Sequence, residues 1–351
     1  MRHRWRFFVI LCSLALAACA STAKQTERGL PLAHAGFDEG KAAYDKGDYV
    51  NAYKEFKLLA DQGDAKAEYW LGFMYANGKG VARNYAEAVK WYSKAAEQGD
   101  ARAQDNLGGM YANGKGVARN YAEAVKWYRK AAEQGDARAQ DNLGGMYANG
   151  KGVAQDYAEA VKWYRKAAEQ GDAKAQFGLG WMYHDGMGVP QDYAQAMKWY
   201  RKAAEQGDKF AQSLLGLMYE NGDGVSKDYA EALKWTRKAA EQGEPGAEYI
   251  LGMMYANGEG VSRDDAEAVK WFRKAAEQGQ AGAQVKMGLL YQAGQGVPQD
   301  FTLAHMWLNL AAAQGDSDAQ KRRDELTEKM TPAQIADAQR LAREWKPKDR
   351  D

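Results

Sequence analysis

A fixed period of 36 residues governs most of this 351-residue sequence. Residues Ala101–Asp136 and Ala137–Asp172 differ from each other at only two positions. Tryptophan keeps the same step at Trp91, Trp127, Trp163, Trp199, Trp235, Trp271 and Trp307. A period of this size is typical of tandem-repeat proteins, and it outweighs any count of globular domains based on length. We therefore divide residues 65–316 into seven units, which we number repeats one to seven.

Each repeat is predicted to form two helices joined by a tight turn. In repeat one, the stretch "AKAEYWLGFMYAN" spaces Ala67, Leu71 and Met74 so that they share one face of a helix. Gly78 follows, and glycine readily adopts the left-handed conformation that ends a helix. A second amphipathic helix fits "YAEAVKWYSKAAEQG", which ends at Gly99. No segment alternates strictly between apolar and polar residues, so the fold class is predicted to be all-α.

The second helix of each repeat is preceded by a strong N-cap residue. These residues are Asn84, Asn120, Asp156, Asp192, Asp228, Asp264 and Asp300. A glutamate or glutamine follows three positions later at Glu87, Glu123, Glu159, Gln195, Glu231 and Glu267. This spacing predicts a capping box, in which the two side chains bond to each other's backbone amides.

A two-helix repeat cannot bury its apolar face alone, so neighbouring repeats must stack into a solenoid with atypical ends. Glycine inside the first helix, as at Gly72, costs roughly 1 kcal/mol relative to alanine and indicates close helix–helix approach. Residues 36–64 keep a helix pair without the glycine turn, and we interpret them as an N-terminal capping unit. Residues 317–351 are predicted to hold C-terminal capping helices, one of which starts at Thr331-Pro332.

The repeat consensus resembles a known family. The pattern A-x-A-x-x-x-L-G-x-M-Y-x-x-G-x-G-V, followed by N/D-Y-x-x-A-x-K-W, is similar to the Sel-like repeat (SLR) of the tetratricopeptide-repeat superfamily, and residues 36–64 look like a plain tetratricopeptide unit. The resemblance implies a right-handed α/α superhelix that serves as a non-catalytic scaffold for protein partners. Some cysteine-rich bacterial relatives have been linked to β-lactam binding or hydrolysis. That activity is not carried over, because the seven repeats contain no cysteine.

The first residues are typical of a bacterial lipoprotein signal. "MRHRWR" is basic, and residues 7–18 are apolar but too few to span a bilayer as a helix. The following Leu16-Ala17-Ala18-Cys19 resembles a lipoprotein cleavage box. We therefore expect residues 1–18 to be removed, Cys19 to be lipidated and residues 19–35 to form a flexible tether. Because Ala20 rather than aspartate follows the cysteine, family rules favour an outer-membrane lipoprotein facing the periplasm.

Composition excludes several classes of function. The two cysteines are Cys12, in the signal, and Cys19, so the mature chain is predicted to lack disulfides and cysteine metal sites. The charge is nearly balanced, with 48 basic and 47 acidic residues, and no basic stripe for nucleic acid is evident. His184 and His305 lie far apart in the sequence. No catalytic, cofactor-binding or metal site is predicted.

One stretch imitates a phosphate-binding loop. Residues 109–115 and 145–151 both fit G-x-x-x-x-G-K. A true phosphate loop follows a strand, opens a helix and carries a serine or threonine after the lysine. Here the stretch starts inside a predicted helix, and Gly116 follows Lys115. We interpret it as a helix end followed by a turn, and the acidic "NGDGVSKDYAE" at residues 221–231 as the same turn rather than a calcium loop.

The seven copies also differ from one another along one face of the first helix. The variable positions in repeat one are Lys66, Tyr69, Trp70, Phe73, Ala76 and Asn77, and this face is expected to line the concave side of the solenoid. The candidate partner-binding residues on it are Tyr69, Trp70, Phe73, Phe177, Trp181, His184, Phe210, Leu214, Tyr249 and Ile250. Large apolar side chains desolvate well at binding surfaces. The alternative is that they pack against the adjacent repeat.

Three hypotheses of function remain open from the sequence. The leading one is a membrane-anchored scaffold that binds a protein or peptide partner, whose identity the sequence does not give. The second is an envelope factor that binds peptidoglycan or an exported polysaccharide, since aromatic side chains also stack on sugars. The third, suggested only by the cysteine-rich relatives, is a β-lactam hydrolase.

Overall fold

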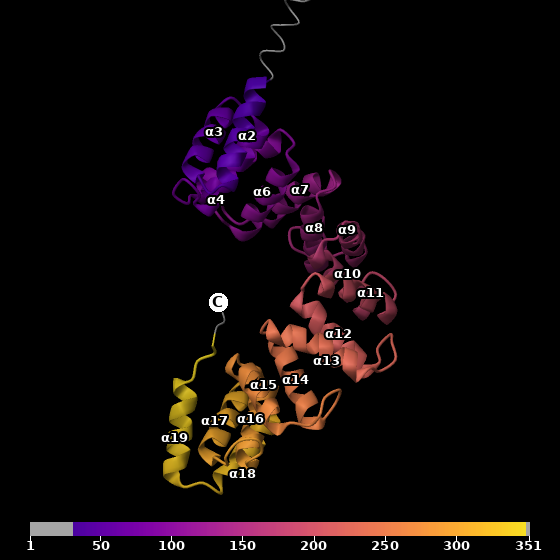
Figure 1. Ribbon diagram of the computed structural model, residues 1–351, viewed down its shortest axis with the longest axis vertical. Coiled ribbons are helices and arrows are strands. Elements are labelled where there is room, and N and C mark those ends of the chain that lie inside the picture. Colours follow the sequence, from indigo (N-terminus) through magenta and orange to yellow (C-terminus); the bar gives the residue numbers. More distant parts are fainter. Residues whose placement is uncertain (1–30, 349–351) are drawn as a thin grey trace, which may run out of the picture. The chain divides into compact units, whose positions relative to one another are not determined.

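The computed structural model describes residues 31–348, and it describes side chains from Gly36 onward. Within these residues the chain is all-α, with helices α2 to α19 following one another and no strand (Figure 1). The contacts divide the chain into two compact units between Asp156 and Tyr157, and we call these the N-terminal and C-terminal units. Cys19 and the proposed signal lie outside the described residues.

Each of the seven repeats contributes two helices of 13 residues. The first helices are α4 (Ala65–Asn77), α6 (Ala101–Asn113), α8 (Ala137–Asn149), α10 (Ala173–Asp185), α12 (Lys209–Asn221), α14 (Pro245–Asn257) and α16 (Ala281–Ala293). The second helices are α5 (Tyr85–Glu97), α7 (Tyr121–Glu133), α9 (Tyr157–Glu169), α11 (Tyr193–Glu205), α13 (Tyr229–Glu241), α15 (Asp265–Glu277) and α17 (Phe301–Ala313). The predicted helix pair and its boundaries are confirmed. The chain is an all-α repeat solenoid.

Two further helix pairs flank the repeats. They are α2 (Pro31–Asp45) and α3 (Tyr49–Asp61) before repeat one, and α18 (Ser317–Thr327) and α19 (Pro332–Glu344) after repeat seven. Helix α2 begins at Pro31, so helical structure starts inside the segment expected to be a tether. At the other end, Leu326 is buried against the last repeat, and Trp345 packs 6.5 Å from the ring of Trp307. The final repeat is therefore covered.

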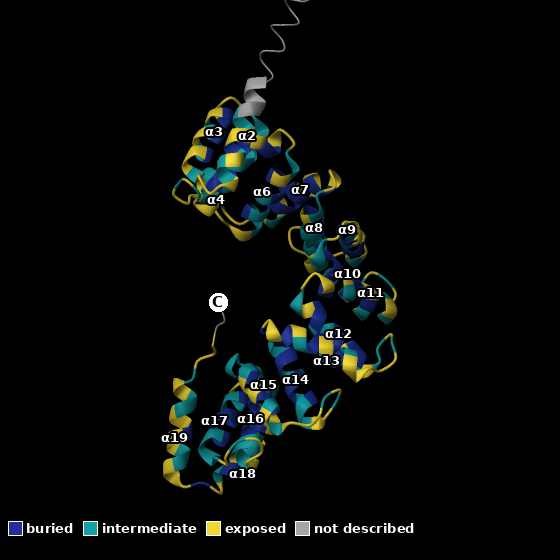
Figure 2. Cartoon of the chain, in the orientation of Figure 1, coloured by how far each residue is buried: buried dark blue, intermediate teal, exposed yellow. Residues whose placement is uncertain are grey.

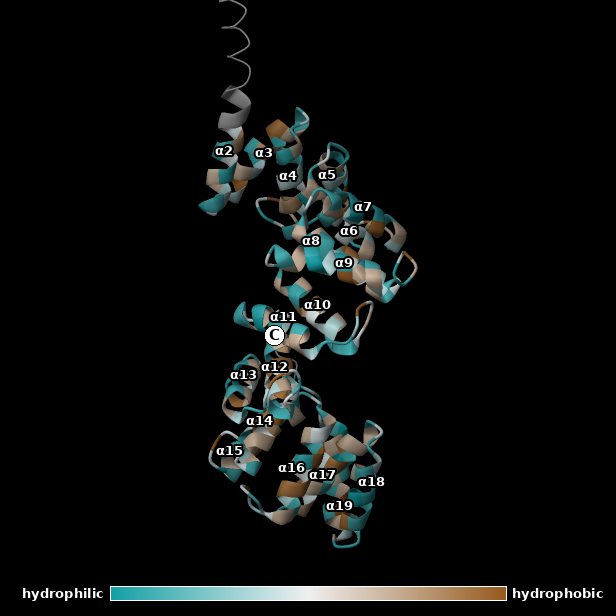
Figure 3. Cartoon of the chain, turned by 90° about the vertical axis from the view of Figure 1, so that its right-hand side faces the viewer, coloured by the Kyte–Doolittle hydropathy of each residue, from teal (hydrophilic) through white to brown (hydrophobic). Residues whose placement is uncertain are grey.

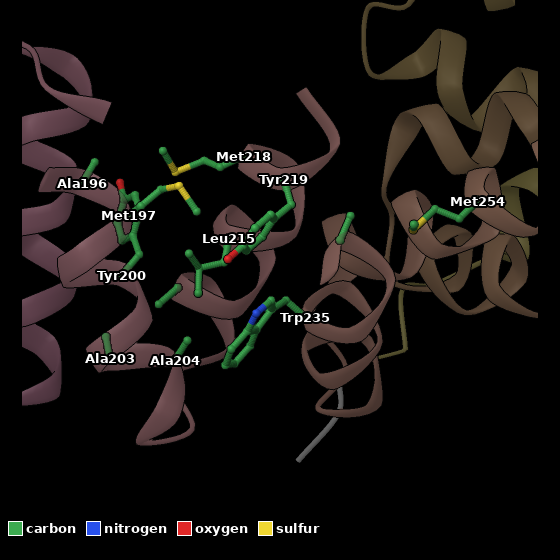
Figure 4. Packing of buried hydrophobic residues seen from close by; sticks show 12 residues of the cluster. Ala196, Met197, Tyr200, Ala203, Ala204, Leu215, Met218, Tyr219, Trp235 and Met254 are labelled. Carbon is green, nitrogen blue, oxygen red and sulfur yellow. The ribbon is translucent and has the colours of Figure 1, made fainter. Parts of the chain in front are cut away.

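Buried side chains of consecutive helices form shared cores. In the C-terminal unit, Met197 and Tyr200 of α11 pack with Leu215 and Met218 of α12 and with Trp235 of α13 (Figure 4). Each helix carries hydrophobic and hydrophilic residues side by side (Figure 3), and the turns between helices are mostly exposed (Figure 2). Burial of apolar surface between neighbours therefore holds the stack together.

The mid-helix glycines mark the closest approach of the two helices in a repeat. A Cβ atom on Gly72 would lie 2.8 Å from the ring of Tyr92, and one on Gly180 would lie 2.7 Å from Tyr200. Real Cβ atoms essentially never come this close to another heavy atom. The predicted close approach is confirmed, and at these two positions glycine is needed because an aromatic ring occupies the space.

The turn that imitates a phosphate loop is a helix end, as predicted. Helix α6 ends at Asn113, and Gly114 adopts a left-handed conformation with φ of 67°. Gly116 has φ of 72°, and a Cβ there would lie 2.2 Å from the backbone oxygen of Tyr85. The turn of repeat two therefore rests directly on the first residue of the second helix of repeat one. Glycine is required at position 116 because a Cβ atom would overlap the backbone of Tyr85.

The predicted capping box forms only in part. The side chain of Asn84 accepts hydrogen bonds from the amides of Ala86 and Glu87, as expected for an N-cap. The amide of Asn84, however, donates to the carbonyl oxygen of Tyr75 at 2.9 Å, so it has no need of the Glu87 carboxylate. Glu87 instead pairs with Lys90 at 3.4 Å. The complete box is found at Thr331 and Gln334, at the start of α19.

A row of buried amides joins neighbouring repeats. Gln104 donates to the carbonyl oxygen of Ala96 at 3.0 Å and accepts from Gln134 at 2.7 Å. The side chain of Gln104 is only 4 % exposed. At the same repeat position, Gln140, Gln176, Gln212 and Gln284 donate to the equivalent carbonyl oxygens. Repeat one carries a glutamate here, Glu68, which is 3 % exposed and accepts from Gln98 at 2.7 Å.

We expect the substitution Glu68→Gln to stabilise the protein. Burial raises the pKa of Glu68, and the hydrogen bond from Gln98 only partly opposes this effect. A carboxylate cannot donate to the carbonyl that the glutamine amide serves in other repeats, so the gain at pH 7 should be about 1 kcal/mol. A carboxyl group whose pKa is raised in the folded state makes its full contribution to protein stability below its unfolded-state pKa of about 4.3. That contribution is lost as the pH rises through the folded-state pKa.

The advantage of Glu68→Gln should therefore be largest at neutral pH and nearly absent at pH 4. Urea unfolding followed by circular dichroism at both pH values measures it. The exposed Glu97, at the end of α5, provides the control Glu97→Gln. Equal effects of the two substitutions at pH 7 would contradict the expectation.

Candidate functional site

The exposed surface of the first helices differs between the two compact units. Among the described residues, the large hydrophobic side chains with the greatest exposure are Val50, Leu58, Trp181, Phe210, Leu217 and Tyr229. Trp181 belongs to α10, whereas Phe210 and Leu217 belong to α12. Their exposed fractions are 44 %, 51 % and 37 %, respectively. They lie on the helix face that varies most between repeats.

Ring contacts through Phe177 join two of these side chains, Trp181 and Phe210. Phe177 lies with its ring centroid 6.0 Å from Trp181 on the same helix and 6.2 Å from Phe210 on the next first helix. Phe177 and Leu214 also pack against the buried core that contains Tyr200. We call Phe177, Trp181, Phe210, Leu214 and Leu217 the α10–α12 face. In this apolar surface, Phe177 and Leu214 pack against the core, whereas Trp181, Phe210 and Leu217 are exposed to solvent.

Hydrogen bonds hold the tryptophan of this face in place. The indole nitrogen of Trp181 donates to Asp185 at 2.7 Å, and the second carboxylate oxygen of Asp185 lies 2.5 Å from Nδ1 of His184. The ring of His184 lies 5.2 Å from that of Tyr193. Most other repeats carry alanine and asparagine where repeat four has His184 and Asp185. The histidine and the carboxylate are thus local departures from the repeat: Asp185 bonds directly to Trp181, and His184 bonds to Asp185.

The candidate residues of repeat one are placed differently. Trp70 stacks on Phe56 of α3, with ring centroids 5.6 Å apart and planes 13° apart, and contacts Tyr44 of α2 at 5.0 Å. Tyr69 and Phe73 pack against the core between repeats one and two. All three candidates are half-buried. Trp70 and Phe73 contact Tyr44 of the N-terminal capping unit, and Tyr69 packs within the array, so the packing alternative describes their contacts.

Tyr249 and Ile250 of α14 are also half-buried. The ring of Tyr249 lies 5.8 Å from that of Phe272, and burial raises the pKa of Tyr249. Ile250 packs against the same core as Phe177. These two side chains contribute mainly to packing between repeats. The structure therefore places Phe177, Trp181, His184, Phe210 and Leu214 on one face, where Trp181 and Phe210 are exposed and the other three are half-buried.

Repeats two and three present a polar network at the equivalent positions. Asp105 is 4 % exposed and binds the guanidinium of Arg138, whose Nε donates to it at 2.9 Å. Asn142 donates to the same carboxylate at 2.8 Å, and Arg138 also donates to Asn106 at 2.9 Å. Burial raises the pKa of Asp105, and Arg138 opposes the rise. These side chains bind one another across two repeats.

Sequence reasoning missed Asp185 as a part of the site. The signal was present, because asparagine occupies this position in repeats one, two, three, five and six. In repeat one this asparagine, Asn77, donates to the carbonyl oxygen of Phe73 at 2.8 Å. Replacing it by aspartate removes that donor and leaves an acceptor for Trp181. Among the described residues, no group of three or more histidine, cysteine or acidic side chains is placed to hold a metal ion.

Comparison with known proteins defines the family of the chain. A family profile for the Sel1 repeat matches residues 65–100, 101–136, 137–172, 173–208, 209–244, 245–280 and 281–316, which are the seven repeats read from the sequence. Because these matches cover most of the chain, the protein belongs to the Sel1 repeat family. Proteins of this family are helical scaffolds for protein–protein interaction.

Solved structures of bacterial Sel1 proteins are similar to this chain. A Sel1 repeat protein from Oxalobacter formigenes is 37 % identical, with 82 % of this chain and 89 % of that chain covered and a TM-score of 0.64. The protective antigen c5321 of uropathogenic Escherichia coli, which displays an SLR fold, is 33 % identical, with 91 % and 85 % covered and a TM-score of 0.47. Among curated proteins, none matches.

Proposed function

We propose that the protein is a non-catalytic scaffold that is anchored to the bacterial outer membrane and binds a protein or peptide partner on the α10–α12 face. The observation that carries this proposal is the joint exposure of Trp181, Phe210 and Leu217 on two adjacent first helices. Exposed aromatic side chains over a rigid core lose little conformational freedom on binding and can release much ordered water.

The neighbours of Trp181 favour a peptide over a glycan. A sugar-binding aromatic ring needs hydrogen-bonding side chains close by for the hydroxyl groups of the sugar. Here Trp181 contacts Phe177, which in turn contacts Phe210, and the hydrogen bonds of Asp185 are directed to Trp181 and His184. The apolar surroundings suit aliphatic or aromatic side chains of a protein partner.

The anchor is proposed from the sequence around Cys19. Lipidation would hold the scaffold at the membrane, since each buried CH₂ group of an acyl chain contributes about 0.8 kcal/mol. Among the described residues, no helix has the length and apolar character needed to cross a bilayer. The absence of aspartate after Cys19 supports the periplasmic face of the outer membrane.

In-cell crosslinking tests the scaffold and the anchor together. A photo-reactive benzoylphenylalanine at Leu217 should give a discrete crosslinked protein, and the additional substitutions Trp181→Ala and Phe210→Ala should remove it. The matched control places the same residue at Tyr229 of α13, which is exposed to a similar extent, 36 %, and should give no such product. Changing Cys19 to serine should move the protein out of the membrane fraction.

Identical crosslinked products from Leu217 and Tyr229 would contradict the proposal. So would binding of this protein to purified peptidoglycan sacculi, rather than to any protein, in a manner that depends on Trp181. Retention of the Cys19→Ser variant in the outer membrane would contradict the anchor alone.

A further inference from the structure

The charges around the α10–α12 face are arranged unevenly. Lys174 lies one helical turn before Phe177 on α10, and Lys209 directly precedes Phe210 on α12. The ammonium of Lys209 lies 5.4 Å from the centre of the Phe210 ring. Both lysines thus sit at the N-terminal ends of the two helices, where the helix dipole adds further positive potential.

Neither lysine forms an ion pair with a carboxylate of the described residues. Within residues 36–348, no salt bridge involves Lys174 or Lys209. The nearest acidic residues in the sequence, Asp172 and Asp208, are N-caps whose side chains accept hydrogen bonds from the amides of Ala175 and Ala211. Neither ammonium group is therefore held in an ion pair.

The opposite end of the face carries acidic residues. Asp185 is the last residue of α10 and accepts from Trp181. Glu220 lies near the end of α12, where burial, followed by the nearby Glu259, raises the pKa of its carboxyl group. A ligand on the face consequently meets lysines at one end, exposed aromatic and aliphatic side chains in the middle and carboxyl groups at the other.

We propose that the α10–α12 face binds a short peptide segment that presents a large apolar side chain to Trp181 and Phe210 and an acidic side chain to Lys174 and Lys209. This inference rests on the proposed function and names the chemistry of the partner. The apolar residue supplies the buried contact, and the acidic residue fixes the direction of the peptide because a basic residue there would face two ammonium groups.

Selection from a phage-displayed library of random dodecapeptides on the full-length protein tests this chemistry directly. Enriched peptides should share an aromatic or large aliphatic residue and a nearby aspartate or glutamate. Synthesised with a fluorescein label, they should bind at least tenfold more weakly to the double variant Trp181→Ala, Phe210→Ala, as measured by fluorescence anisotropy. Raising the salt concentration should weaken binding to the wild type, because the lysines are exposed.

Charge reversal tests the acidic residue. The double variant Lys174→Glu, Lys209→Glu should lower affinity for the same peptides at least tenfold and should select basic residues when the library is panned on it. Two controls lie on second helices outside the face: Tyr229→Ala on α13 and Lys198→Glu on α11. Both controls should leave affinity unchanged, and circular dichroism verifies that every variant keeps its helices.

The outcomes separate the inference from the proposed function. Enriched peptides that bind through Trp181 and Phe210 but show no acidic preference, and that ignore the lysine variant, would overturn the inference and leave the scaffold function standing. Failure to enrich any peptide, together with binding to purified sacculi, would overturn both. Self-association that is lost in the Trp181, Phe210 variant would identify a second copy of the chain as the occupant and would also overturn the inference.

Discussion

Alanine at Gly108 is expected to destabilise the protein, whereas alanine at the adjacent Gly109 is expected to stabilise it. Both glycines lie inside α6, so both substitutions gain roughly 0.5–1 kcal/mol of helix propensity. A Cβ on Gly108 would lie 2.7 Å from Cδ1 of Tyr128, while one on Gly109 would lie 3.6 Å from the hydroxyl oxygen of Tyr128. The first contact is an overlap with a buried ring, and the second is an ordinary contact.

Overpacking of a core costs about 1–3 kcal/mol. Because the gain in helix propensity is shared and cancels, the two variants should differ by about 1–3 kcal/mol. Hydrogen exchange of the α6 and α7 amides, followed by mass spectrometry, measures the change where it arises. Faster exchange in Gly108→Ala and slower exchange in Gly109→Ala are expected. The same sign for both variants would mean that Tyr128 moves aside at little cost.

The substitution Arg138→Met is also expected to lower the free energy of unfolding substantially. It leaves the carboxylate of Asp105, which is 4 % exposed, without its cationic partner. Breaking such a pair costs about 3–5 kcal/mol when both groups are buried, and the 60 % exposure of the Arg138 side chain reduces our expectation to about 2 kcal/mol. Chemical unfolding at pH 7 measures the loss.

A matched control comes from the preceding repeat. Arg102 occupies the same repeat position and pairs with Asp100 at 3.0 Å. The Asp100 carboxylate is also satisfied by the amide of Ala103, so Arg102→Met should cost less than about 1 kcal/mol. Equal losses from the two substitutions would show that the buried carboxylate of Asp105 does not depend on Arg138.

The cost of Arg138→Met should depend on pH with a definite sign. Burial raises the pKa of Asp105, and the substitution removes the guanidinium that holds the rise in check. The folded variant would then keep a proton on Asp105 to a higher pH than the unfolded chain, whose aspartate pKa is about 3.9. Stability is therefore retained below that value and lost as pH rises through the folded-state pKa. Unfolding at pH 4 should show a smaller loss than at pH 7.

The regular part of the fold could be predicted because the seven copies repeat the same local signals. The N-cap residue before each second helix and the glycine at the end of each first helix fixed the helix boundaries. The capping box was overestimated, since the sequence of one repeat does not show that the amide of Asn84 is already bound to Tyr75. Likewise, the pattern could not reveal that residues from Pro31 continue as helix α2.

The candidate site could be predicted only as a face. Comparing the copies identified Trp70 and Trp181 as equivalent in kind, because both are large aromatic residues on variable positions of the first helix. Their exposure depends on neighbours that lie far away in sequence: Phe56 of α3 stacks on Trp70, whereas Trp181 stays 44 % exposed. Long-range contacts of this type decide whether an aromatic side chain is part of a core or of a surface.

The packing of each glycine turn on the preceding repeat affects how the number of repeats in such chains can change. Gly116 touches Tyr85, and Gly152 makes the same contact with Tyr121 one copy later. A stretch of DNA that encodes 36 residues therefore encodes both contacting parts: the glycine turn that packs on the preceding repeat, and the helix start on which the turn of the following repeat packs. Its duplication yields a new neighbour that already fits, and the near-identity of residues 101–136 and 137–172 has the form that such a copying event leaves behind.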